Sequence, residues 1–334
     1  MSNSTVIRTS DRVKYRKCRQ LWDFSSDIRM GYKPVKEIEA LEFGTAIHAG
    51  LEAWYNSFSF PYEVKYAVML KAFIETVNSQ LRELEDNPHF TVDSETEQEF
   101  EERRVLGTGM LNYYADYSMK NDSFEVVDVE YEFQIPLFDS VVYEGKIDLI
   151  VRDSHGEIYL IDHKTAGRLG GTGWLDVDTQ ISSYCWALWE EGYNVAGFTY
   201  NQLFKGYPKR PNVNKNGSLS KDKNQHTTYD MYCEALEEEG LDSKDYTDML
   251  DHLKNNPKEY VRRRTVTRSE SELEQQRSII MSEAREMVND PVIYPNPNEF
   301  NCNSCKFFEP CLARLEQSDP YDFLDNPELY IQGQ

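Results

Sequence analysis

The spacing of apolar residues separates a helical first third of the chain from a strand-rich middle. Apolar side chains recur at helical spacing in three long segments of the first third, which predicts helices over residues 43–58, 63–84 and 97–119. The next segments are short, rich in β-branched and aromatic residues and separated by turn signals, which predicts consecutive strands over residues 124–137, 141–153 and 157–166.

The pattern then alternates once more. Residues 176–192 have the spacing of a helix, with an aspartate available as its cap and Gly192 near its end, and residues 195–204 are typical of another strand. A polar loop follows over 206–226, and the chain turns helical again, including a helix over 269–289. Strands interleaved with helices indicate an α/β protein.

Two of the predicted strands carry acidic side chains in register. Side chains alternate along a strand, so Asp162 and Lys164 share one face and His163 points to the other. A three-residue loop centred on His155 would place Asp148 opposite Asp162, with Cβ atoms roughly 5 Å apart. Two carboxylates this close repel each other, and a bound cation relieves that repulsion most readily. Oxygen ligands favour Mg²⁺ or Mn²⁺.

Such a site suits the hydrolysis of a phosphodiester. A metal would neutralise charge on the phosphate, and Lys164 would orient the attacking water or stabilise the transition state. The alternative is an ordinary surface ion pair between Asp162 and Lys164.

Charge gives two opposite indications about a nucleic-acid partner. The formal net charge is -22, which argues against phosphate binding. Basic residues nevertheless gather in 205–223 and again at Arg262, Arg263, Arg264 and Arg268. Each block is either a local basic track or a solvated surface.

The cysteine spacing indicates a shared inorganic partner. Cys302, Cys305 and Cys311 lie within ten positions, and the N-terminal segment shows no secretory signal and no membrane span. We therefore expect a cytoplasmic protein with reduced thiols, in which clustered cysteines bind a metal or a cluster. Cys185 and Cys233 stand alone inside predicted helices and are expected to be small apolar side chains.

The order of the motifs resembles the RecB-type branch of the PD-(D/E)XK nuclease superfamily. GTAIH contains Gly44 and His48, EGKID contains Asp148, IDHK contains Asp162 and Lys164, and QISSY contains Gln180 and Tyr184. The resemblance implies that His48, Asp148, Asp162 and the backbone carbonyl of His163 bind the metal. It also implies that Asp148, Asp162 and Lys164 are catalytic and that Gln180 and Tyr184 support the lysine and the DNA. Position 162 departs from many members, which carry the longer glutamate there.

The cysteines resemble those of the iron–sulfur subgroup, which includes AddB-type nuclease domains and the nucleases of CRISPR adaptation. That subgroup carries one cysteine before the core and a C-x-x-C-x5-C group after it, matched here by Cys18 and by Cys302, Cys305 and Cys311. The resemblance implies a [4Fe-4S] cluster that fastens the two chain ends together. A Cys₄ zinc site is the alternative that spacing leaves open.

These observations lead to one set of expectations. The fold is a restriction-endonuclease-like α/β core, a mixed central sheet flanked by helices, with a helical region closed by the cluster. A single nuclease domain over 1–334 would consist of an N-terminal helical part, a core, an insertion with helices, and a cluster loop with tail: 1–120, 121–205, 206–290 and 291–334.

The resemblance implies metal-dependent hydrolysis of DNA, exonucleolytic on single-stranded ends, and a compact nuclease of this kind is expected to act in recombination, repair or phage DNA metabolism. The sequence has no P-loop motif, so ATP-driven unwinding would need a helicase partner. Tryptophans are packing residues by default, and Trp174 in the glycine-rich loop GRLGGTGWLD is the one expected to touch DNA. The alternative function is a non-catalytic scaffold that binds DNA or protein and uses the cysteines structurally.

Overall fold

A mixed β-sheet lies at the centre of the molecule. The computed structural model describes residues 4–86, 91–289 and 291–333, with only the backbone described for 36–42. The sheet has the order β1-β4-β5-β6-β7, and β3 pairs with β4 off this path. Its strands are β1 (Thr5–Arg8), β3 (Glu125–Phe138), β4 (Val141–Arg152), β5 (Ile158–Ala166), β6 (Val195–Phe204) and β7 (Val261–Val266).

The sheet divides along one edge of β4. This edge pairs in parallel with β1 from Thr5↔Val141 to Arg8↔Glu144, and antiparallel with β5 from Leu149↔Ile161 to Arg152↔Ile158. The other edge of β4 is taken by β3 along its whole length. Among the described residues, no strand partner is recorded on the divided edge for 145–148, so Asp148 lies where β1 and β5 separate.

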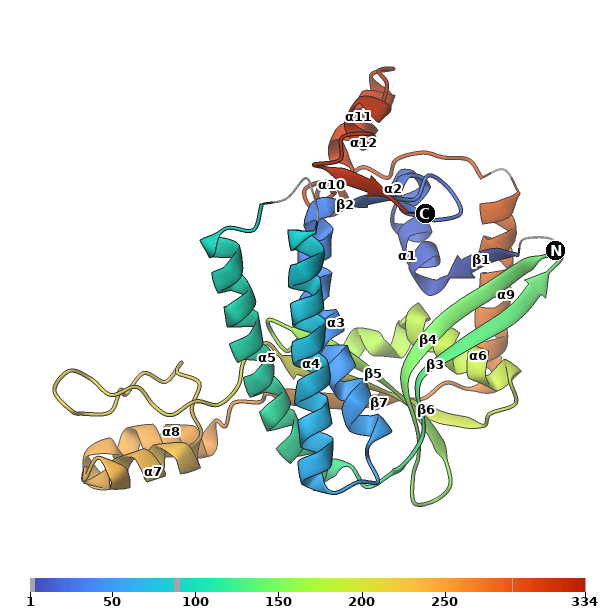
Figure 1. Cartoon of the computed structure of the whole chain (residues 1–334). Coiled ribbons are helices and arrows are strands. Elements are labelled where there is room, and N and C mark those ends of the chain that lie inside the picture. Colours follow the sequence, from blue (N-terminus) through green and yellow to red (C-terminus); the bar gives the residue numbers. More distant parts are fainter. Residues whose placement is uncertain (1–3, 87–90, 290, 334) are drawn as a thin grey trace.

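Helices cover both faces of the sheet (Figure 1). Apolar residues of α3 (Val35–Asn56), α4 (Tyr62–Glu85) and α5 (Ser94–Asn121) share a core with Leu149 and Ile161. Apolar residues of α6 (Thr179–Glu190) and α9 (Glu270–Val288) share a second core with Ile150 and Leu160. Side-chain caps start several of these helices, including Asp178 on α6 and the Ser269–Glu272 capping box on α9.

The segment between β6 and β7 forms a separate projection with its own small core (Figure 1). It contains α7 (Tyr229–Glu238), a 3₁₀ turn η2 (Ser243–Tyr246) and α8 (Thr247–Asn255). Tyr232, Tyr246 and Met249 are buried within it. At its base the ring of Phe204 stacks on His226, and Phe204 N–H donates to the carbonyl of Tyr260.

Segments from the first and last parts of the chain pack together in the upper part of Figure 1. Strand β2 (Tyr32–Pro34) pairs with β8 (Tyr330–Gln332), and Phe24, Phe307 and Tyr330 share a small core. The remaining helices of these ends are α1 (Thr9–Lys17), α2 (Arg19–Ser25), α10 (Glu299–Cys302), α11 (Phe308–Leu315) and α12 (Tyr321–Leu324).

The α/β class and the mixed sheet flanked by helices are confirmed. The long helices and the strands of the middle third lie within a few residues of their predicted bounds, apart from the start of α3 at Val35. The hairpin is confirmed as well, because Arg152 pairs with Ile158 across a loop in which Gly156 has φ of 84°. The division into four parts stays a prediction. No helix in the described part of the chain is both long and apolar enough to span a bilayer.

The expectation that the chain is helical after the polar loop was wrong for residues 261–266, which form β7. This strand reads VRRRTV, so its charges hide the alternation that marks a strand. Its arginines find partners inside the protein, as described below, and that pairing makes a charged strand acceptable within the sheet.

Candidate functional site

The acid and the lysine of β5 face the helix α6 side of the sheet. Lys164 Nζ donates to Asp162 Oδ1 at 2.9 Å, and the Asp162 carboxylate is almost fully buried. Burial raises the pKa of Asp162 to about 6, although the positive charge of Lys164 opposes the rise. For Lys164, burial is outweighed by the charge of Asp162, and the pKa of the lysine is raised. The lysine is therefore a fixed cation beside a carboxylate that titrates easily.

The second carboxylate, Asp148 on β4, is held in its charged form. Its Oδ2 accepts the backbone N–H of His163 at 2.7 Å and lies 3.5 Å from His48 Nδ1. Burial would raise the pKa of Asp148, but the hydrogen bond and charge of His48 outweigh it and lower the pKa to about 2. The predicted register, in which position 148 opposes 162, is the one that β4 and β5 follow up to Leu149↔Ile161.

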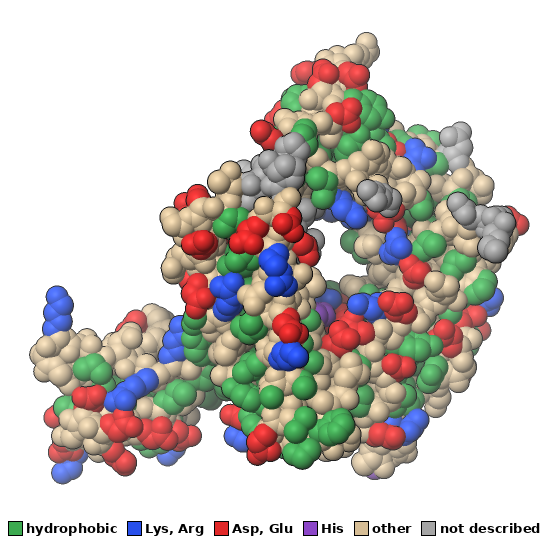
Figure 2. Space-filling view, in the orientation of Figure 1, with side chains coloured by type: hydrophobic (Ala, Val, Ile, Leu, Met, Phe, Trp, Pro, Cys, Tyr) green, Lys and Arg blue, Asp and Glu red, His purple; other side chains and the backbone are tan. Residues whose placement is uncertain are grey.

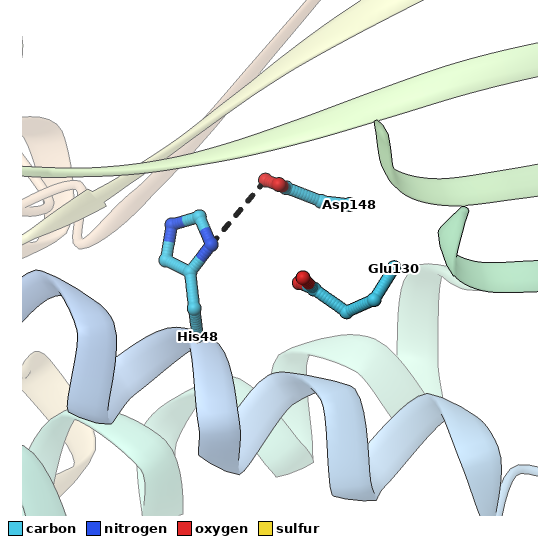
Figure 3. A group of neighbouring side chains, drawn as sticks. All are labelled: His48, Glu130 and Asp148. Carbon is cyan, nitrogen blue, oxygen red and sulfur yellow. Dashed lines mark ion pairs between the residues drawn. The ribbon is translucent and has the colours of Figure 1, made fainter. Parts of the chain in front are cut away.

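His48 reaches the site from the middle of α3 (Figure 3). Its Nε2 lies 2.8 Å from the carbonyl oxygen of His163, the backbone atom expected to bind a metal. Burial lowers the pKa of His48, yet its hydrogen bond to Asp148 more than compensates and the pKa is raised overall. The Asp148 carboxylate and the His163 carbonyl thus contact different nitrogens of the His48 ring.

Sequence reasoning missed Glu130. One ligand atom each from His48, Glu130 and Asp148 lies within 4.8 Å of the others. Figure 3 shows the Glu130 carboxylate pointing toward His48 and Asp148. Asp162 is not a member of this group. Glu130 also has φ of 54°, a left-handed conformation that is strained for a residue with a side chain, and it forms an ion pair with Lys146.

Gln180 and Tyr184 lie one turn apart on α6. Gln180 Nε2 donates to the Tyr184 hydroxyl at 3.0 Å. Burial raises the pKa of Tyr184 to about 12, and the charges of Asp162 and Lys164 also act on its hydroxyl. The structure therefore brings this pair beside the acid and lysine, and their functional roles stay predictions.

The ring of His163 faces away from the site into a buried polar network. Its Nδ1 lies 2.7 Å from Asn201 Nδ2, and Asn201 Oδ1 accepts from Arg263 Nε at 3.0 Å. The Arg263 guanidinium forms an ion pair with the fully buried Asp122 carboxylate. Hydroxyl groups complete this network: Tyr55, Tyr114 and Ser118.

The other arginines of the second basic block hold the glycine-rich loop. Arg262 Nη1 donates to the carbonyl of Gly170 at 3.1 Å, Arg264 pairs with Asp176, and Arg268 Nη2 donates to the carbonyl of Leu175 at 2.7 Å. With Arg263 in the network above, each arginine of the block has an internal partner. The arginines of this block are therefore not free charges, although Arg262 and Arg264 remain partly exposed.

These residues surround an open hollow. It has a volume of about 330 Å³ and is lined by Gly44, Thr45, His48, Glu130, Lys146, Asp148, His163, Lys164 and Thr165. Figure 2 shows an opening through the molecule between the α3–α4 layer and the region of α1 and β1, with basic and acidic side chains around its rim. A histidine side chain is visible at the lower rim.

The four cysteines named from the sequence surround one small cavity. Cys18, Cys302, Cys305 and Cys311 all line it, together with Leu21, Phe24, Asn296 and Phe307. Burial raises the pKa of Cys305, and it raises that of Cys311 to about 11. No three of these sulfurs in the described structure lie within 4.8 Å of one another. Cys185 is buried in α6, as expected, whereas Cys233 is half-buried in α7.

Comparisons with known proteins agree with this geometry. The sequence model of a family described as "PD-(D/E)XK nuclease superfamily" matches residues 10–311. The search of curated proteins returned no match for the chain. The matched range takes in Cys18, every residue of the hollow and the cysteine loop.

Proposed function

The chain belongs to the PD-(D/E)XK nuclease superfamily, and from this premise we propose that it is a metal-dependent deoxyribonuclease acting on single-stranded DNA ends. The observation that carries the proposal is the convergence of His48, Glu130, Asp148 and Lys164 on one open hollow. A solvated face would not place two largely buried acids beside a lysine that is itself only partly exposed.

The donor set fits a hard divalent cation. Carboxylate, carbonyl and imidazole groups are the ligands that Mg²⁺ and Mn²⁺ accept, and His48, Glu130, Asp148, Asp162 and the His163 carbonyl would hold such an ion. When bound, the cation supplies charge neutralisation at the phosphate and a lower pKa for an attacking water. All of these groups except Glu130 are predicted as ligands from the sequence, and the structure adds Glu130.

The chain's own residues have separate tasks in this reaction. Lys164, fixed by Asp162, would orient the water and donate to the phosphate oxygen that gains charge. Tyr184, supported by Gln180, would keep the lysine in place from α6. Asp148 would hold His48 and the backbone of His163 in one arrangement.

An end-directed reaction is favoured by the shape of the molecule. Figure 2 shows an opening through the molecule, and a flexible single strand can enter an opening more readily than a stiff duplex. We therefore propose that a strand end enters beside the hollow. Because the sequence has no P-loop, a helicase partner would supply unwound strands in recombination, repair or phage DNA metabolism in the cytoplasm.

We also propose that the four cysteines hold a [4Fe-4S] cluster. A single zinc ion bound at 2.3 Å in a tetrahedron would draw its sulfurs to about 3.8 Å from one another. The four cysteines line one cavity in the described structure and no three of their sulfurs lie within 4.8 Å of one another, which supports a group larger than a single ion.

The test compares linear and circular substrates. Wild-type protein purified without oxygen should degrade linear single-stranded DNA in Mg²⁺ or Mn²⁺, leave circular single strands largely intact, and stop when a chelator is added. Degradation of circular and linear strands at equal rates would contradict the end-directed part alone. A folded protein that binds DNA but cleaves none of these substrates would instead establish the scaffold function.

A further inference from the structure

Trp174 is more exposed than the other tryptophans of the molecule. Trp22, Trp54 and Trp186 are almost fully buried, whereas Trp174 is 49% exposed in the 3₁₀ turn η1 (Gly173–Val177). An exposed tryptophan loses the free energy of burial unless a ligand covers it. Its position relative to the hollow indicates which ligand that is.

Tyr200 connects Trp174 to the acid and lysine of β5. The rings of Trp174 and Tyr200 meet edge to face with centroids 5.7 Å apart. Tyr200 on β6 is the registered neighbour of Asp162 in a parallel pair, so both side chains lie on the same face of the sheet. The Asp162 and Lys164 charges both act on the Tyr200 hydroxyl, whose pKa is raised first by burial.

The tryptophan is also held in place. Its indole N–H donates to the carbonyl of Gly171 at 3.0 Å. Arg264 pairs with Asp176 and donates to Thr172, so the turn is tied to β7 on both sides of the ring. Because the ring is already fixed, covering it with a ligand would cost little conformational entropy, which favours its use as an interaction surface.

We propose that Trp174 and Tyr200 form a stacking site for one unpaired base of the DNA strand, next to the phosphate that is cleaved. This inference rests on the proposed nuclease function and specifies the substrate. Bases inside a duplex have both faces covered by their neighbours, so only a single strand can offer a free face to the indole. Stacking accepts all bases, because each has a π-face.

Charge supports stacking as a main source of affinity. The chain carries a formal net charge of -22, Arg263 is paired with a buried carboxylate, and Arg262 and Arg264 already form ion pairs with Glu259 and Asp176 at the surface. These arginines therefore have less charge to offer a phosphate, so an aromatic surface near Asp162 would contribute to holding the strand.

Binding of a short oligothymidine tests the proposal, with Ca²⁺ replacing the catalytic metal so that cleavage is not required. Trp174→Ala should weaken binding by roughly 10- to 100-fold, the loss expected for one stacked base. Trp174→Phe should retain most of the affinity, whereas Trp174→Leu, which keeps apolar bulk without a π-face, should resemble the alanine variant. Phe60→Ala, at an exposed aromatic in the turn between α3 and α4, is the matched control and should bind like wild type.

Substrates with one abasic position identify the stacked base. Wild type should lose affinity when the abasic position occupies the site, and Trp174→Ala should not distinguish that substrate from the intact strand. Binding of a blunt duplex should be the same for wild type and Trp174→Ala. Equal oligothymidine binding by these two proteins, or equal sensitivity of both to the abasic position, would overturn the inference. Absence of cleavage in Mg²⁺ and Mn²⁺ would contradict the nuclease function instead, and the binding result would stand separately.

Discussion

Two carboxylates one strand apart have opposite protonation tendencies. Asp148, held by His48 and a backbone N–H, has a pKa of about 2, whereas burial raises that of Asp162 to about 6. In the proposed reaction both would bind a cation, and Lys164, which donates to Asp162, would contact the phosphate. We therefore expect the reaction to depend on each of these three side chains.

We expect Asp148→Asn, Asp162→Asn and Lys164→Ala each to reduce cleavage by at least about 100-fold, because each removes a charge that acts on the transition state. Circular dichroism should show folded proteins, and the lysine variant should still bind DNA. Asp153→Asn, in the hairpin loop beside β5, serves as the control. Normal digestion by a folded Asp162→Asn protein would show that the proposed site does not carry the activity.

Glu130 should change the metal requirement. Glu130→Gln removes a charged ligand and leaves Lys146 without its partner, so a higher concentration of Mg²⁺ should be needed for half-maximal cleavage. Glu132→Gln, at an exposed acid on the same strand, should leave that concentration unchanged. A metal titration that superimposes for Glu130→Gln and wild type would show that Glu130 serves only Lys146.

His163 should make folding sensitive to acid. Burial lowers the pKa of its ring to about 3, below the ordinary value of 6.5. The unfolded chain therefore binds a proton that the folded protein excludes, and stability present above pH 6.5 is lost at about 1.4 kcal/mol per pH unit as the pH falls toward 3. Urea midpoints should drop less steeply with acid in His163→Gln than in wild type. If the urea midpoints of the two proteins fall equally with pH, the folded protein can protonate the His163 ring and the prediction is wrong.

At the scale of elements, the arginines of β7 reach groups on both faces of the sheet. Arg263 points into the network that ends at the His163 ring, and its neighbours Arg262 and Arg264 point to the loop that carries Trp174. Alternation along one strand thus links the network at the His163 ring with the loop that carries Trp174.

Arg263→Met should lower the free energy of unfolding by about 3–5 kcal/mol, because it leaves the buried Asp122 carboxylate without its cation. Thermal unfolding measures the loss, and adding Asp122→Asn should restore part of it. Arg152→Ala, which breaks an exposed ion pair with Glu125, should cost less than about 1 kcal/mol. Similar losses in the two single variants would mean that Arg263 is solvated.

The elements also show what the sequence could and could not predict. Strong periodicity placed the long helices, and a glycine in the hairpin loop placed Asp148 relative to Asp162. Glu130 escaped because β3 has an irregularity between Pro136 and Phe138 that shifts its register against β4 by one residue. Counting back from the turn would have set Glu130 opposite Leu149, whereas the pairs Val129↔Leu149 and Tyr131↔Ile147 place it beside Asp148.

At the scale of the whole molecule, the cysteine cavity joins segments from opposite ends of the chain. Cys18→Ser should lower the thermal midpoint and remove visible absorbance and iron together, because α2 and the C-terminal helices lose their common anchor. Some cleavage should persist at low temperature, since no cysteine lines the hollow. Cys233→Ser should keep both colour and midpoint. If the wild-type protein is colourless and contains stoichiometric zinc, the cluster assignment is wrong, and the proposal for the nuclease site is unaffected.

The same cavity also sets an order of folding during synthesis. Cys18 is translated before β4, β5 and β6, and residues 302–311 follow some hundred positions after β6. The strands beside the hollow can therefore pair while the anchor of α2 is still missing. A translation product interrupted before Cys302 would carry every residue of the hollow and yet lack three of the four thiols. Closure of the cavity thus marks the stage of synthesis at which residues 302–311 have joined the folded core.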